Sequence, residues 1–393
     1  MKPVAPRIGR SAVVLMLAAV FVGCGQQGAT TVAPATSGPA ASSGASTAEP
    51  TKRGTAYEVA TPRKPSEGSP AKYVLITNGN SPFWDAVRIG MENAGKDLGV
   101  KVDLMVNDAT DQGQMEKLRQ IGTQTDIVGV GLSAVQAQAP GVADEMRKLQ
   151  AKGVHVITVD SDVDRDLYPD ARFAFVGTDN LVGGRELGVC AKGLRPDGGS
   201  YVTFVGIKAS QNAQERIGGF GEGAGEKFKD MDSMGDDVDE VRARENVRNA
   251  IRNHPGLNTL VGIWSYNAPA IVDVVKELDR RKDFTIVTFD AEPGAIKAMA
   301  AGQIDAMVVQ NPYEMGYQGI RLLKALVEGD GMVIDAMMPK VGQPAGNIYD
   351  TGLKVVVPDE GSPLKADLFG PKTQFMKLGE FREWLTKYGL EGS

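Results

Sequence analysis

Residues 72–99, KYVLITNGNSPFWDAVRIGMENAGKDLG, decide the fold of this chain. Tyr73–Thr77 is a short apolar, β-branched run with the length of a strand that is buried on both faces. A turn at residues 78–80 follows, with Ser81 as the expected helix cap and Pro82 at the first helical position. Apolar residues then recur at helical spacing. The stretch predicts a strand, a turn and a helix.

The same alternation of strand and helix continues along the chain, which predicts an α/β fold with parallel sheets and helices on both faces. Further strands are expected at Val102–Val106, Ile127–Leu132, Val154–Asp160, Phe173–Gly177, Tyr201–Val205, Thr259–Trp264, Phe284–Phe289, Asp305–Gln310 and Leu353–Val357. So many strands exceed one core and predict two doubly wound sheets. Residues 229–237, KDMDSMGDD, are expected to form a loop with at best a short edge strand. An amphipathic helix is expected near Phe375–Tyr388.

The amino-terminal residues have the pattern of a targeting segment. Basic residues precede an apolar stretch, Ser11–Val22, which is shorter than the ~20 residues that a membrane-spanning helix needs. Cys24 follows small residues and resembles the cysteine of the bacterial lipobox, which is diacylated. We expect residues 1–23 to be a lipoprotein signal peptide and the exported protein to be anchored in the periplasm or cell envelope by acylated Cys24. A plain secretory signal with an incidental cysteine is the alternative.

The composition is that of a slightly acidic globular protein. The 393 residues are 42% hydrophobic and carry a net charge of -6, without the basic stripe expected of a nucleic-acid-binding protein. Residues 24–70 are rich in Ala, Ser, Thr, Gly and Pro, which predicts a disordered tether. Cys190 is the only other cysteine and is expected to be a small buried hydrophobe.

Catalytic motifs are scarce. The two histidines, His155 and His254, lie far apart in the sequence, and no HExxH, CxxC, GxSxG or P-loop motif occurs. The turn at residues 178–185 opens a helix but does not fit the dinucleotide-binding fingerprint. We therefore expect no enzymatic activity, no metal site and no cofactor.

Polar or aromatic residues follow most of the expected strands at their carboxyl ends. These ends form the ligand-binding edge of an open α/β sheet. Carboxylates, a guanidinium and amides beside aromatic faces suit a neutral polyhydroxylated ligand, whose hydroxyls bond in both directions while its C–H faces stack. Any one of these residues could instead be structural. They are Thr77–Trp84, Asp160, Asp162, Gln211–Arg216, Trp264–Asn267, Asp290 and Gln310.

From about Lys72 to Pro358 the sequence resembles the periplasmic sugar-binding proteins of the ribose-binding type. The order and spacing of several segments carry the resemblance, among them SPFWDAVRIGMENAGKDLG, VHVITVDSD, FAFVGTDNLVGGRELG, NAQERIGGF, TIVTFDAEPGAIKAMAAGQIDAMVVQNPYEMGYQGI and KVVVP. The resemblance implies two similar lobes joined by three hinge crossings, near Gly177–Asp179, Gln310–Pro312 and Gly342–Tyr349. The implied division is 71–177 plus 311–344 for the N-terminal lobe, 178–310 plus 345–358 for the C-terminal lobe, and 359–393 as a C-terminal extension.

The resemblance also implies a set of ligand contacts. Two aromatics match the pair that sandwiches the sugar ring, an aspartate matches the ring-hydroxyl acceptor, and an arginine, a carboxylate and a hinge amide complete the set. In chain order the matching residues are Ser81, Phe83, Trp84, Asp160, Arg216, Asp290 and Gln310. By their positions after strands we add Thr77, Asp162, Tyr266 and Asn267.

Some positions depart from the family's pattern. Ser161 stands where an arginine usually follows the first aspartate, the usual asparagine of the first loop falls at Ser81, and Ser265–Ala268 replaces an Asn-Asp pair. The position of the usual second-lobe aromatic falls near Asp239. Ribose is therefore not assumed to be the ligand.

The function that the resemblance implies is solute capture. We expect a monomeric lipoprotein that closes on a small sugar or polyol and delivers it to the membrane permease of an ATP-driven ABC importer. A surface-tethered sugar sensor that signals to a membrane receptor is the alternative. A repressor with this core would need an N-terminal helix-turn-helix in place of the signal segment and tether, and a dinucleotide-dependent sugar oxidoreductase is the enzymatic alternative.

Overall fold

The computed structural model describes residues 61–64, 70–343 and 346–393, which all belong to one compact unit of the chain. The predicted signal peptide, Cys24 and most of the predicted tether lie outside the described residues. One described part of that tether packs on the folded body: the backbone N–H of Arg63 donates to the carbonyl of Gly153 at 2.8 Å, and its guanidinium donates to the carbonyl of Gln124.

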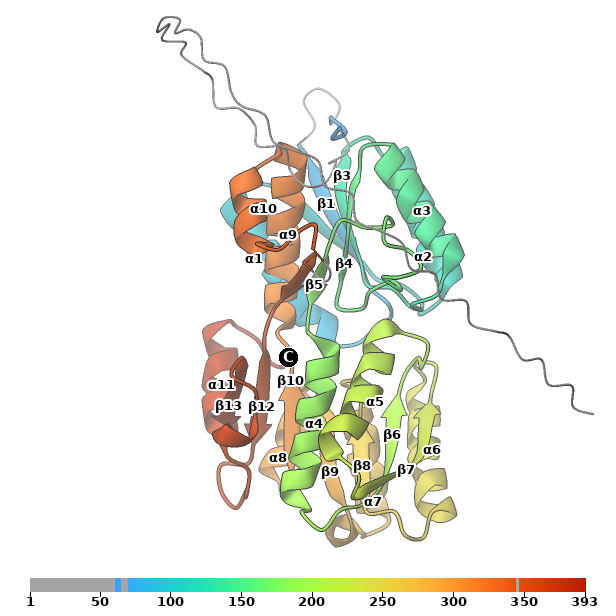
Figure 1. Cartoon of the computed structure of the whole chain (residues 1–393), viewed down its shortest axis with the longest axis vertical. Helices are drawn as coiled ribbons and strands as arrows, with labels where there is room; N and C mark the ends of the chain where they lie inside the picture. Colours follow the sequence, from blue (N-terminus) through green and yellow to red (C-terminus); the bar gives the residue numbers. More distant parts are fainter. Residues whose placement is uncertain (1–60, 65–69, 344–345) are drawn as a thin grey trace, which may run out of the picture. The chain divides into compact units, whose positions relative to one another are not determined.

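Within the described residues, the first sheet has six parallel strands in the order β11-β5-β4-β3-β1-β2. They are β1 (Lys72–Ile76), β2 (Lys101–Met105), β3 (Ile127–Leu132), β4 (His155–Val159), β5 (Phe175–Gly177) and β11 (Ile348–Asp350). One face carries α1 (Phe83–Leu98), α9 (Pro312–Glu328) and α10 (Gly331–Met337), and the other carries α2 (Asp111–Thr123) and α3 (Pro140–Ala151) (Figure 1). We call this sheet and its helices the first lobe.

The second sheet has seven strands in the described part of the chain, in the order β13-β12-β10-β9-β8-β6-β7, and only the β10–β12 pairing is antiparallel. They are β6 (Gly199–Val205), β7 (Phe228–Gly235), β8 (Thr259–Gly262), β9 (Thr285–Phe289), β10 (Ala306–Val309), β12 (Leu353–Val357) and β13 (Thr373–Lys377). One face carries α4 (Asn180–Leu194) and α5 (Gln211–Ala224). The other carries α6 (Glu240–Asn253), α7 (Asn267–Glu277), α8 (Pro293–Ala300) and α11 (Leu378–Lys387). We call this the second lobe.

The prediction of two doubly wound sheets joined by three chain crossings is confirmed. The chain leaves the first sheet after β5, returns after β10, and leaves again between β11 and β12. This last crossing lies at Thr351–Gly352, after the predicted Gly342–Tyr349, because β11 still pairs with β5 of the first sheet. Residues 348–350 therefore belong to the first sheet and not to the predicted C-terminal lobe.

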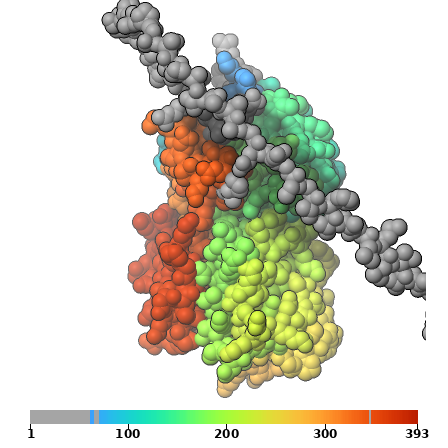
Figure 2. Space-filling model, in the orientation of Figure 1, coloured from blue at the N-terminus to red at the C-terminus, as the bar shows by residue number. Residues whose placement is uncertain are grey.

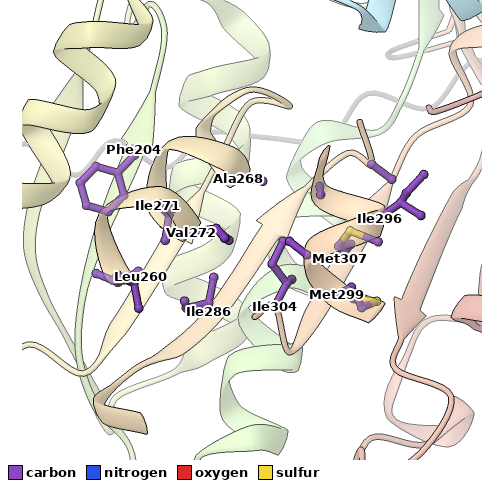
Figure 3. Packing of buried hydrophobic residues seen from close by; sticks show 14 of the residues in the cluster. Phe204, Leu260, Ala268, Ile271, Val272, Ile286, Ile296, Met299, Ile304 and Met307 are labelled. Atoms are coloured by element: carbon purple, nitrogen blue, oxygen red, sulfur yellow. The ribbon is translucent and has the colours of Figure 1, made fainter. Parts of the chain in front are cut away.

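Apolar side chains fill a layer on each face of both sheets. Figure 3 shows one such layer, in which side chains of β6, β8, β9 and β10 meet those of α7 and α8. Leu260, Ile286 and Met307 are fully buried there. Burial of a side chain of this size contributes ~1.5–3 kcal/mol, so these layers are the main source of stability of each lobe.

Two expectations about local structure were wrong. Residues 229–237 were expected as loop with at best a short edge strand, but residues 228–235 form the eight-residue edge strand β7, which pairs along β6. An edge strand satisfies its backbone on one side and needs no apolar run, so its side chains gave little sign of it. The helix expected from Phe375 begins at Leu378, because Phe375 lies in β13 opposite Val355.

Other local details also differ from the predictions. The short elements β11 and α10 were not anticipated. Helix α1 begins at Phe83 without a side-chain cap, so the predicted Ser81 cap is wrong; the carbonyl of Ser81 instead accepts the N–H of Trp84 at 3.2 Å.

Candidate functional site

A cavity lies among the carboxyl ends of strands from both sheets. Both lobes contribute to the wall. The lining residues are Asn78, Gly79, Asn80, Ser81, Phe83, Trp84, Asp160, Asn212, Arg216, Val238, Trp264, Ser265, Tyr266, Asp290 and Gln310.

One guanidinium between two carboxylates forms the charged part of the site. Arg216 Nη2 lies 3.9 Å from Asp160 Oδ1, and Arg216 Nη1 lies 3.9 Å from Asp290 Oδ2. Asp160 follows β4 of the first sheet and Asp290 follows β9 of the second. At this distance the charges attract without direct hydrogen bonds, so the donor and acceptor capacity of all three groups is incompletely used.

Two hydrogen bonds and one aromatic contact hold Arg216 in place. Its Nε donates to Asn180 Oδ1 at 2.8 Å, its Nη1 donates to the carbonyl of Ile263 at 3.1 Å, and its guanidinium carbon lies 3.9 Å from the ring centre of Phe289. These contacts fix the plane of the guanidinium. Burial lowers the pKa of Arg216, while the two carboxylates oppose that shift.

Helix packing brings Arg216 to this position. A Cβ atom on Gly184 of α4 would lie 2.3 Å from the carbonyl oxygen of Arg216, and one on Gly219 of α5 would lie 2.3 Å from the carbonyl oxygen of Leu181. Glycine at these positions lets α4 and α5 approach closely. Helices α1 and α9 of the first lobe approach each other in the same way, since a Cβ on Gly90 would lie 2.0 Å from the carbonyl oxygen of Tyr313.

Both carboxylates are buried and partly bonded. Ser133 Oγ donates to Asp160 Oδ2 at 2.9 Å, and Gln310 Nε2 donates to Asp290 at 3.0 and 3.2 Å. Burial raises the pKa of Asp290 to about 7, although Arg216 and Gln310 act in the opposite direction. Burial also raises the pKa of Asp160.

Aromatic rings from each lobe line the cavity. Phe83 and Trp84 at the start of α1 are edge to face, with ring centres 5.3 Å apart. Trp264 and Tyr266 follow β8, with ring centres 6.5 Å apart. Tyr266 is held in place because its hydroxyl donates to Asp236 Oδ1 at 2.5 Å.

Several buried polar atoms of the lining residues have no hydrogen-bond partner within the described part of the chain. They are Arg216 Nη2, Asn212 Oδ1, Trp264 Nε1 and Gln310 Oε1. An unpaired buried polar atom costs ~1–3 kcal/mol, so such atoms are uncommon without a functional reason. Two donors and two acceptors around one cavity match a ligand that both donates and accepts.

The cavity brings together most of the residues singled out in the sequence. Those that line it are Ser81, Phe83, Trp84, Asp160, Arg216, Tyr266, Asp290 and Gln310. Thr77, Asp162 and Asn267 do not line it. The Thr77 hydroxyl donates to the carbonyl of Gly79, and Asn267 Nδ2 donates to Asp236 Oδ2 at 2.9 Å.

The carboxylate of Asp162 is bound by two arginines and a threonine hydroxyl. Arg172 and Arg165 pair with its carboxylate at 2.6 and 2.9 Å, and Thr158 Oγ1 donates to it at 2.5 Å. Burial raises the pKa of Asp162, but the arginines and the hydroxyl outweigh it, so the pKa lies below its usual range. A carboxylate so fully bonded has little capacity left for a ligand.

Some lining residues were not chosen individually from the sequence. Asn78, Gly79 and Asn80 lie in the turn after β1, and Trp264 and Ser265 lie directly after β8, within stretches that the strand-end rule had indicated. Asn212 lies one helical turn before Arg216 on α5, a spacing that could have indicated it. Val238 had no such signal. It precedes Asp239, which caps α6, so no aromatic occupies that position.

The two lobes touch beside the cavity. The N–H of Ala137 donates to the carbonyl of Ala209 at 2.9 Å, and Ser210 Oγ donates to the carbonyl of Val135. Arg165 Nη1 lies 3.3 Å from Glu215 Oε1, so an ion pair also joins the lobes. The structure is thus a closed form, with the cavity between the lobes.

Two kinds of site were also searched among the described residues. No group of three or more His, Cys, Asp or Glu side chains there could hold a metal ion. No described helix has the length and apolar character needed to cross a bilayer.

Residues 72–331 match the model of the periplasmic binding protein domain, which covers more than half of the chain. The chain belongs to the periplasmic binding protein family. Its relatives include the D-allose-binding periplasmic protein of Escherichia coli (25% identical over 260 residues, 64% of this chain and 82% of that protein). They also include the ribose import binding protein RbsB of Salmonella typhimurium (24% over 263 residues, 65% and 84%).

Two solved structures, of a solute-binding protein and of a sugar-binding protein, have the same fold. A solute-binding protein from Burkholderia graminis in complex with D-arabinose aligns with a TM-score of 0.66 at 24% identity, over 75% of this chain and 97% of that one. The glucose-galactose binding protein GanP of Geobacillus stearothermophilus aligns with a TM-score of 0.64 at 23% identity, over 74% and 98%. The predicted family and fold class are therefore confirmed.

Proposed function

We propose that this periplasmic binding protein captures a small neutral sugar or polyol between its two lobes. The observation that carries the proposal is the set of unpaired buried polar atoms, on Arg216, Asn212, Trp264 and Gln310, around one cavity. Hydroxyl groups can satisfy donors and acceptors alike, whereas a carboxylate or ammonium ligand would satisfy only one kind. Curated relatives named for allose and ribose binding support the same ligand class.

The proposed contacts divide by chemistry. Asp160 and Asp290 accept from ligand hydroxyls, Arg216 donates through Nη2, and the rings of Phe83 and Trp84 stack on the C–H faces of the sugar. Further proposed contacts are Ser81, Asn212, Trp264, Tyr266 and Gln310. Hydrogen bonds to charged groups contribute ~1.5–3 kcal/mol each, and a few of them supply the ~8 kcal/mol of micromolar binding after ordering costs.

Ligand binding stabilises the closed form because only that form presents residues of both lobes at once. The first lobe would supply Phe83, Trp84 and Asp160, and the second lobe would supply Arg216 and Asp290. The crossings after β5, β10 and β11 would act as the hinge. We infer that the protein works as a monomer, since one chain contains the whole site.

We propose that the exported and anchored protein delivers its ligand to an importer in the membrane. Acylation of Cys24 would hold the protein at a membrane surface, and residues 24–60 would act as a tether that lets the lobes meet the permease of an ATP-driven importer. Cross-linking in intact cells tests this step. Recovery of a permease supports it, and recovery of a receptor instead would favour the sensor role.

Calorimetry on Asp290→Ala tests the proposed site. The variant should lose most binding in a screen of pentoses, hexoses, deoxysugars and polyols. The ligand-free protein should stay folded with a lower melting temperature, because the variant also breaks the buried pair with Arg216. The exposed neighbour variant Asp283→Ala is the matched control. Undiminished binding by Asp290→Ala would overturn the site assignment.

A further inference from the structure

The segment after α11 returns to the ligand site. Strand β13 extends the second sheet by pairing with β12, and α11 buries Leu378, Phe381 and Leu385 in the core of the second lobe. Figure 2 shows the chain from β12 onward, in red, along one side of the second lobe. The start of the segment is thus firmly anchored. We call residues 389–393 the strap.

The strap turns back toward the hinge. Gly389 has a φ of 66°, a left-handed conformation that glycine adopts without strain, and the N–H of Leu390 donates to the carbonyl of Leu385 at 3.0 Å. Leu390 is 7% exposed and Ser393 only 3%. The label C in Figure 1 marks where the strap lies, at the junction between the two sheets.

Ser393 bonds to the backbone of Ala291, which follows Asp290, and to the backbone of Gln310. Its N–H donates to the carbonyl of Ala291 at 3.0 Å, and the N–H of Ala291 donates to its oxygen at 2.6 Å. Its Oγ donates to the carbonyl of Gln310 at 3.0 Å. Since Gln310 Nε2 in turn donates to Asp290, a closed ring of contacts joins Ser393, Ala291, Asp290 and Gln310.

The fit of the strap is close. A Cβ atom on Gly392 would lie 2.8 Å from the carbonyl oxygen of Ala291 and 2.9 Å from Cδ of Pro293. The strap also lines a second cavity with Phe83 and with the turn before α8. It contacts the chain directly after Asp290 and the strand end at Gln310.

The strap holds the turn at Asp290. The φ of Asp290 is 65°, a left-handed conformation that aspartate adopts more readily than most non-glycine residues. The pair of bonds between Ala291 and Ser393 fixes the peptide that follows Asp290, and the bond to the carbonyl of Gln310 fixes the neighbouring strand end. Without them the N–H of Ala291 would be buried without its partner.

We propose that the strap is a positioning element of the ligand site, in which Ser393 acts through Asp290 and Gln310 without touching the ligand. This inference rests on the proposed function, because it assigns a role in sugar affinity to residues beyond the part that matches the family model. The strap preorganises the carboxylate and the amide, so its loss reduces affinity without removing any ligand contact.

Two variants of the full chain test the proposal: Ser393→Ala, and a chain that stops after Leu390. Hydrogen exchange of the ligand-free protein comes first. Residues 289–293 should exchange faster in the shorter chain, which loses both backbone bonds to Ala291. Ser393→Ala keeps those bonds and loses only the bond to the carbonyl of Gln310, so its melting temperature should stay within a few degrees of the parent. Titration with D-allose, D-ribose and D-arabinose should then show dissociation constants raised about threefold by Ser393→Ala and about tenfold by the shorter chain.

Controls separate positioning from a general effect. Glu391→Ala removes an exposed strap side chain and should change neither readout. Ser393→Thr keeps the hydroxyl that bonds to Gln310, so it should restore the affinity lost in Ser393→Ala. Unchanged exchange at residues 289–293 in the shorter chain overturns the proposal, whether or not any sugar binds. If the parent binds no sugar while exchange accelerates as expected, the strap still positions Asp290 and the proposed function is what fails.

Discussion

Asp160 and Asp290 approach the same guanidinium from two different sheets, each at 3.9 Å from Arg216. Each directly follows a strand, β4 or β9, and each has a left-handed backbone, with φ of 64° and 65°. The two lobes thus present equivalent carboxylates to one arginine. Because the two carboxylates belong to different lobes, separation of the lobes would dismantle the arrangement, which links ligand contact to closure.

Replacement of Arg216 should abolish binding. Arg216→Met removes the donor Nη2 and leaves two buried carboxylates without their cation. Loss of two charged hydrogen bonds at ~1.5–3 kcal/mol each lowers affinity by more than about a hundredfold. The melting temperature should also fall, because breaking a buried ion pair is destabilising. Calorimetry and thermal unfolding measure both, and Arg185→Met, at an exposed ion pair on α4, should change neither.

Gly184→Ala should displace the ligand-binding arginine without touching it. The added Cβ would lie 2.3 Å from the carbonyl oxygen of Arg216, so α4 and α5 must separate. Overpacking of this kind costs ~1–3 kcal/mol, and sugar affinity should fall with stability. Gly218→Ala on α5 is the matched control, because nothing lies within 4 Å of its Cβ. An unchanged melting temperature for Gly184→Ala would contradict the close packing.

The ion pair between Arg165 and Glu215 should contribute to closure only. Glu215→Gln weakens a contact between lobes at 3.3 Å, so the sugar should dissociate about 1.4- to fivefold faster, as expected from the ~0.2–1 kcal/mol that ion pairs near the surface contribute. The ligand-free melting temperature should not change. Stopped-flow dissociation measures the rate. Glu222→Gln, whose partner Arg185 lies in the same lobe, should leave the rate as in the parent.

Stability of the ligand-free protein should depend on the protonation of Asp290. Its folded-state pKa of about 7 lies above the usual 3.8, so the folded state binds more protons than the unfolded state between these values. The free energy of unfolding therefore decreases as pH rises from about 4 to about 7. Asp290→Asn should flatten this decrease in thermal scans across pH. The same slope in Asp290→Asn and in the exposed control Asp85→Asn would exclude Asp290 as its source.

Local patterns predicted most of the strands and helices because their apolar residues repeat with the period of the element. The errors lie where pairing rather than side-chain pattern decides. Strand β7 carries charged residues yet pairs with β6, and β11 is a three-residue strand held by β5. The same limit applies to the site. Asp162 and Asp160 follow the same strand, but the partners Arg165 and Arg172 that occupy Asp162 could not be read from its position.

By itself, the sequence determined the two parallel sheets and the side of each sheet on which polar residues gather, since alternation of apolar strands and amphipathic helices leaves few other arrangements. Only the tertiary structure decided which of those residues share one cavity. It placed Asp160, Arg216 and Asp290 together, excluded Thr77, Asp162 and Asn267, and brought Ser393 against the turn after Asp290. These relationships depend on contacts between residues far apart in the chain, which no local pattern records.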